Sequence, residues 1–104
     1  MEDFFKYDER LDILIPHLEK DFSDYTPRIQ DAILTQWEQI RGTIPERIKC
    51  MEEKINHKLD LLNDEDDFEI SCHLNFEIAE LASTINDLWI WYRTDQSITG
   101  KIHS

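Results

Sequence analysis

Apolar residues repeat with the period of an α-helix from residue 70 to residue 92. Successive members of this row are 4, 4, 3, 4, 3 and 4 residues apart: Ile70, Leu74, Ile78, Leu81, Ile85, Leu88 and Tyr92. Residues three and four apart are neighbours on one side of a helix, whereas a strand would alternate at every second residue. The pattern predicts one long helix over residues 68–94.

The same stretch carries a second, weaker apolar row on the opposite side of the helix. Its members are Phe76, Ala79, Ser83 and Ile90, with the large ring of Trp89 beside them. A helix with two apolar sides needs cover on both, from its own chain or from a second copy. These five residues therefore predict a protein interface, and a homodimer is the expected assembly.

An earlier helix is expected over residues 3–22. Apolar residues repeat there every three or four positions: Phe4, Tyr7, Leu11, Leu14 and Leu18. Pro16 lies inside this stretch, and a proline in a helix interior removes a hydrogen bond and crowds the preceding turn. We therefore expect a kink near Ile15.

Two more helices follow, each with a start signal. Thr26 is a good N-cap residue before a helix over 27–41, and Gly42 suits a left-handed stop at its end. A third helix over 44–62 begins at Thr43, which has the capping-box spacing to Glu46. Acidic residues 64–67 then precede the long C-terminal helix, where the helix dipole favours negative charge.

These segments predict an all-α fold: an up-and-down bundle of about four helices with the long C-terminal helix at its centre. Residues 1–94 would form a single domain, and residues 95–104 a loose tail. The second and third helices are alternatively one bent rod. With only two glycines and three prolines in 104 residues, the chain lacks the turn residues of an all-β fold.

The formal net charge is −12, which disfavours direct binding of nucleic acid, because phosphate neutralisation needs a basic surface. No apolar run is long enough to span a membrane, and the N-terminus is acidic where a signal peptide would be positive. The expected location is the cytoplasm. Cys50 and Cys72 are too few for a disulfide framework and are expected to be buried structural thiols.

Four potential metal ligands fall at matching heights if the last two helices form a hairpin about Glu65. They are Glu53 and His57 on one helix and His73 and Glu77 on the other. Imidazole and carboxylate groups can bind zinc or iron. However, these residues lie off the core stripes, so solvated side chains are the preferred interpretation, and no metal or other cofactor is expected.

No arrangement of residues indicates catalysis, and three functions stay open. The first is a non-enzymatic interaction or regulatory protein that associates through the helix over 68–94, with itself and with an unidentified protein. The second is an acidic inhibitor or immunity-type protein that masks a basic nucleic-acid-binding partner, since no Lys or Arg occurs between Leu59 and Tyr92. The third is a metal-binding helical bundle.

Overall fold

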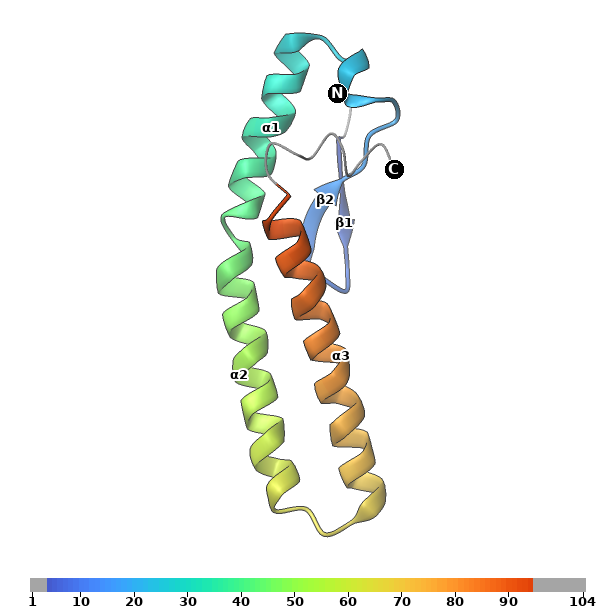
Figure 1. Ribbon diagram of the computed structural model, residues 1–104, viewed down its shortest axis with the longest axis vertical. Coiled ribbons are helices and arrows are strands. Elements are labelled where there is room, and N and C mark those ends of the chain that lie inside the picture. Colours follow the sequence, from blue (N-terminus) through green and yellow to red (C-terminus); the bar gives the residue numbers. More distant parts are fainter. Residues whose placement is uncertain (1–3, 95–104) are drawn as a thin grey trace.

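The computed structural model describes residues 4–94 of the chain (Figure 1). Its elements in order are strands β1 (Phe5–Asp8) and β2 (Ile13–Pro16), the 3-10 helix η1 (Phe22–Asp24), and helices α1 (Pro27–Arg41), α2 (Ile44–Asn63) and α3 (Phe68–Tyr92). Helices make up about 69% of the described chain. The tail predicted over residues 95–104 lies outside the described residues.

The prediction of an all-α, up-and-down bundle of about four helices is wrong. α1 and α2 form one bent helix of 37 residues, and a small two-stranded sheet takes the place of the first helix. Figure 1 shows α3 running back beside α2, with the strands next to its C-terminal half. The structure therefore agrees with the bent rod that was the alternative for the second and third helices.

A β-hairpin replaces the helix predicted over residues 3–22. β1 and β2 pair antiparallel, with Phe5 opposite Pro16 and Asp8 opposite Ile13. In β2, Ile13 is buried while Leu14 is 38% exposed, which is the alternation of a half-buried strand. Pro16 is the last residue of β2, which is an edge strand of a two-stranded sheet, and an edge strand tolerates a proline.

The turn of the hairpin is fixed by two aspartates. The Asp8 carboxylate accepts a hydrogen bond from the Leu11 backbone N–H at 2.9 Å. Asp12 has a positive φ of 58°, a left-handed conformation that aspartate tolerates better than most residues. The Tyr7 hydroxyl donates a hydrogen bond to the Asp12 carboxylate, and this bond raises the pKa of Tyr7. Such side-chain bonds to nearby backbone compete with helix formation.

The step from α1 to α2 is a bend within one helix. Gly42 has φ −63° and ψ −19°, so the predicted left-handed stop is wrong. The predicted capping box is wrong too, because the Thr43 hydroxyl donates to the Ile40 carbonyl at 2.7 Å instead. Pro45 lies in the first turn of α2 and has no N–H to donate to the preceding turn. The helix therefore bends here but continues.

Two other start signals are confirmed. The Thr26 hydroxyl accepts a hydrogen bond from the Ile29 N–H at 3.3 Å, with Pro27 as the first residue of α1. The Asp67 carboxylate accepts from the N–H groups of Glu69 and Ile70, at 2.9 and 3.1 Å. Each cap satisfies donors that the first helical turn leaves unpaired. The sequence therefore determines where α1 and α3 begin.

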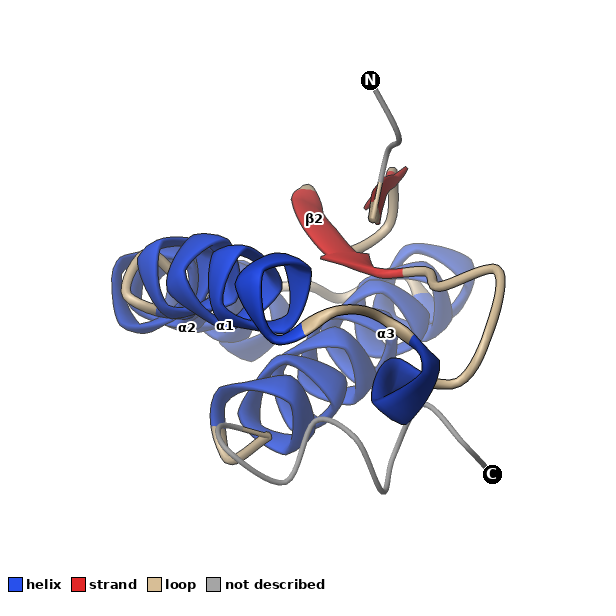
Figure 2. Cartoon of the chain, turned by 90° about the horizontal axis from the view of Figure 1, so that it is seen from above, coloured by secondary structure: helices blue, strands red, loops and turns tan. Residues whose placement is uncertain are grey.

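The main core lies where the bent helix, the sheet and the C-terminal half of α3 meet. Its buried residues are Leu11, Ile13, Trp37, Ile44, Ile48, Met51 and Leu88. Beyond Met51, α2 and α3 continue together as a two-helix hairpin that we call the arm, residues 52–81. Within the arm only Leu74 is buried. Figure 2 shows the strands on one side of the layer formed by α2 and α3.

Candidate protein interface on the helical arm

Large apolar side chains are exposed along α2 and α3. On α3 the exposed fractions are Phe68 80%, Phe76 63%, Ile70 49%, Trp89 37% and Ile90 37%, and on α2 they are Leu61 48% and Leu59 41%. Single exposed apolar residues are ordinary, but a group along one pair of helices marks an interaction surface. The arm and the C-terminal part of α3 that continues it are therefore the candidate functional site.

The five residues of the predicted interface have different surroundings in the structure. Phe76, Ala79 and Ile90 are exposed. Ser83, in contrast, accepts a hydrogen bond at 2.9 Å from the guanidinium of Arg10 in the β1–β2 turn. The same guanidinium forms an ion pair with Asp87 at 2.6 Å. A charged group from the hairpin thus lies within the row that was predicted to be apolar.

Trp89 lies on another side of α3 from Ser83. Its ring packs edge-on against Tyr92, with centroids 5.5 Å apart, and the Arg41 guanidinium lies 5.0 Å from the centre of the Tyr92 ring. Trp91 instead faces the core, where its ring meets Trp37 edge-on at 5.7 Å. The aromatic end of α3 therefore contributes both to the core and to the exposed surface.

A groove runs between α2 and α3 on the Trp89 side of the arm. It has a volume of about 460 Å³ and is lined by Glu52, Ile55 and Asn56 from α2 and by Ala82 and Ile85 from α3. The groove could not be recognised from the sequence, because its lining mixes apolar, small and polar residues from two helices. One sequence pattern does point to this side of α3: Phe68, Asn75, Ala82 and Trp89 follow one another at intervals of seven residues.

The opposite side of the α2–α3 layer is charged. Lys58 of α2 pairs with Glu77 of α3 at 3.4 Å, and Glu77 also meets His73 at 3.6 Å. Nearer the core, Arg47 pairs with Asp12 of the hairpin turn at 3.4 Å. The two sides of the layer therefore differ in chemistry: one carries ion pairs and the β-hairpin, and the other carries the groove.

The four candidate metal ligands do not form one cluster. His73 and Glu77 contact each other, but the α2 residue that reaches Glu77 is Lys58 rather than His57. Glu53 and His57 border a separate shallow hollow on α2. Side chains of antiparallel helices point in opposite directions along the axis, so residues at one height need not meet. Among residues 4–94, no three His, Cys, Asp or Glu side chains are grouped to hold a metal ion.

The two cysteines differ from expectation. Cys50 and Cys72 are both exposed, so the prediction of buried thiols is wrong. Each lies on a side of its helix that faces away from the neighbouring helix, and a helix with only one long neighbour leaves such positions in water.

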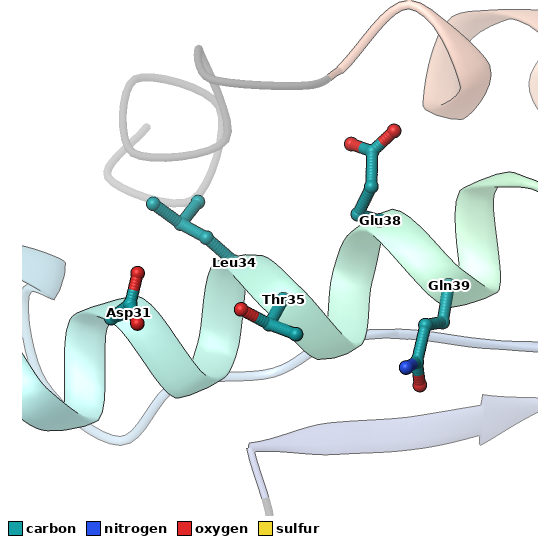
Figure 3. Close-up of a pocket in the computed structure, with 5 residues that line it drawn as sticks. All are labelled: Asp31, Leu34, Thr35, Glu38 and Gln39. Carbon is teal, nitrogen blue, oxygen red and sulfur yellow. The ribbon is translucent and has the colours of Figure 1, made fainter.

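Another hollow lies along α1 and has a volume of about 630 Å³. Figure 3 shows its lining residues on successive turns of the helix: Asp31, Leu34, Thr35, Glu38 and Gln39. Glu38 is already paired with Arg41 at 2.7 Å, and all but Leu34 are exposed.

Within residues 4–94 no helix has the length and apolarity needed to cross a membrane. Comparisons with protein-family models, curated proteins and solved structures found no match.

Proposed function

We propose that this protein is a small, non-enzymatic interaction protein that acts through its helical arm and binds a second copy of itself there. The observation that carries the proposal is the exposure of five large apolar side chains on α3, from Phe68 to Ile90. Full burial of one such side chain contributes roughly 1.5–3 kcal/mol, so covering several of them is worth much more than a surface contact.

The second support is that little of the chain packs against the arm. A two-helix hairpin can bury only the strip between its helices, whereas a four-helix arrangement covers a full stripe on each. Two arms packed together form four helices and give Ile55, Ile78 and Leu81, which are now half-buried, a complete surrounding. Pairing therefore completes a core that one chain leaves open.

Sedimentation equilibrium of the wild-type chain over a micromolar concentration series tests this function. We expect a reversible monomer–dimer equilibrium, with helical content that changes little on dilution, because α2 and α3 already pack against each other in the single chain. A protein that stays monomeric at high micromolar concentration contradicts the proposal.

The acidic inhibitor is the second candidate, and one observation favours it. The end of the arm carries six acids between Asp60 and Glu69 and no base. A charge-driven complex with a basic partner weakens steeply with ionic strength, whereas an apolar dimer does not. Capture of basic proteins from a host extract at low salt, with release at about 0.5 M salt, would favour this function over self-association.

A further inference from the structure

The groove on the Trp89 side of the layer has two walls that extend beyond the residues lining its central volume. On α3, Phe68, Asn75 and Trp89 share one side of the helix with Ala82, because the four residues are spaced seven apart. Phe68 and Asn75 lie toward the arm tip, and Trp89 lies toward the core. On α2, Leu59 follows Glu52 by seven residues and Ile55 by four, so it continues the opposite wall. These residues therefore continue the two helix faces that line the groove, toward the arm tip and toward the core.

This α3 row is symmetric about its middle. Phe68 and Trp89 are equally distant from the midpoint between Asn75 and Ala82. If a second copy packs antiparallel, with the two-fold axis at that midpoint, Phe68 of each copy lies level with Trp89 of the other. Asn75 then lies level with Ala82. Large rings meet at both ends and small or amide side chains meet in the centre, where close approach is needed.

The groove also has the composition of an interface. The polar residues on its walls are mostly uncharged, Asn56 and Asn75 among them, and Glu52 is the charged residue that lines its central volume. Interface centres are depleted in charge and enriched in aromatic residues. The other side of the layer is unsuitable, because pairing there would desolvate the ion pairs of Lys58 and Arg10.

Charge decides the direction of pairing. Acidic residues 64–67 form the loop at the arm tip, and the exposed Arg93 lies four residues beyond Trp89 at the other end of the row. In the antiparallel arrangement Arg93 of one copy comes near the acidic loop of the other, because Arg93 follows Trp89 along the chain and the loop precedes Phe68. A parallel arrangement would bring the two acidic loops together and the two Arg93 side chains together. In the parallel arrangement these like charges would be close together and would repel. In the antiparallel arrangement the two acidic loops lie at opposite ends of the dimer, beyond the Debye length of ~10 Å.

The face is large enough for a dimer. From Phe68 to Trp89 the row is roughly 30 Å long, and two helices side by side are about 20 Å wide. The resulting face of roughly 600 Å² is close to the ~800 Å² that each partner buries in an interface of standard size.

We propose that two copies of this chain pair antiparallel through the α2–α3 groove, with Phe68 of each arm packed against Trp89 of the other and the acidic loop against Arg93. The inference rests on the proposed self-association and adds its face and its direction.

Ala82→Glu tests the face, because Ala82 is exposed in the single chain and central in the proposed dimer. Burying the new carboxylate twice in each dimer should raise the dissociation constant about 100-fold or more in sedimentation equilibrium. Ala32→Glu, at an exposed position of α1, is the matched control, and Phe76→Glu tests the neighbouring face of α3. Both should dissociate like the wild type, and circular dichroism should show all three variants folded.

A charge exchange tests the direction. Arg93→Glu and Asp64→Lys should each weaken the dimer roughly ten-fold at low salt, since each removes two ion pairs per dimer and adds repulsion. The double variant should recover wild-type affinity, because it restores both pairs with their signs exchanged.

The outcomes distinguish the two proposals. A monomeric wild type overturns both. A dimer that tolerates Ala82→Glu but dissociates with Phe76→Glu keeps the self-association and overturns the groove. A dimer that loses affinity with Ala82→Glu but shows no recovery in the charge-exchanged double variant overturns the antiparallel direction.

Discussion

Trp37 offers the sharpest test of how the core holds the two long helices together. Its side chain is 1% exposed, stacks on Phe5 at 6.3 Å and meets Trp91 edge-on. Its indole N–H donates to the backbone carbonyl of Thr94, just after the end of α3. Trp37→Phe keeps an aromatic ring in the core but removes this donor.

The loss of the hydrogen bond should dominate the effect. Replacing indole by a phenyl ring removes about 40 Å² of buried surface, worth roughly 1 kcal/mol. The Thr94 carbonyl, in a residue that is only 5% exposed, is then left without its donor, at a cost of roughly 1–3 kcal/mol. We therefore expect Trp37→Phe to lower the free energy of unfolding by about 2–4 kcal/mol.

Urea denaturation followed by circular dichroism measures this change, at a protein concentration low enough to keep the chain monomeric. Trp89→Phe is the matched control, since Trp89 is 37% exposed and outside the core, and it should cost less than about 0.5 kcal/mol. Equal destabilisation by the two substitutions, or a loss below about 1 kcal/mol for Trp37→Phe, would refute the reasoning.

Two smaller predictions follow from the bend and from the hairpin turn. Gly42→Ala should stabilise the chain by about 0.5–1 kcal/mol in the same denaturation assay, because the Gly42 backbone is helical. The added Cβ would meet the Gln39 and Glu38 carbonyls at ordinary contact distances of 3.5 and 3.6 Å. A destabilised variant would contradict the helical bend. The hydrogen bond to Asp12 raises the pKa of Tyr7 in the folded chain. The contribution of this bond to stability should therefore be complete below the ordinary tyrosine pKa of about 10, and it should be lost as the pH rises through the pKa that Tyr7 has in the folded chain. Absorbance titration of tyrosinate should show one phenol ionising late in the wild type and closer to its ordinary pKa in Asp12→Asn, and an unchanged titration would exclude this cause.

The three helices of the fold were predictable from the sequence because local and long-range signals agree there. Thr26 and Asp67 cap α1 and α3, and the apolar period runs through each helix without a break. The bend was ambiguous, since Gly42 has both a left-handed and a helical conformation open to it at little cost. In the structure Gly42 is helical, and the Gly42 and Thr43 N–H groups donate to the Glu38 and Ile40 carbonyls, so the chain continues through the bend.

The hairpin was mispredicted because its residues fit two periods. Phe4, Tyr7, Leu11 and Leu14 match a helix, but Ile13 and Ile15 before Pro16 also match a short strand. β-branched residues prefer strands, and the residue before a proline avoids the helical region. The aspartate bonds in the turn add to that preference. A hairpin also covers Trp37 and Leu88 from the side, which a continuing helix over these residues would not do.

The candidate interface was predictable in part. The excess of apolar surface on α3 is visible in the sequence, and Trp89 of the predicted set follows Ile85, which lines the groove, by four residues. The hydrogen bond between Arg10 and Ser83 was not predictable, because the two residues are 73 positions apart and meet only through the hairpin. The groove needs α2 as its second wall, so its recognition depends on the pairing of the two helices.

The continuity of the bent helix gives the arm a mechanical connection to the core. α2 extends roughly 30 Å from the bend, so a 5 Å displacement of its tip corresponds to a rotation of about 10°. Through a rigid bend, the same rotation would move a backbone position five residues before Gly42 by about 1 Å, and that position is Trp37. Its indole lies against Trp91 and bonds to the Thr94 carbonyl. A displacement of the arm tip would therefore shift Trp37 against Trp91 and Thr94, and tryptophan fluorescence is the measurement to follow it.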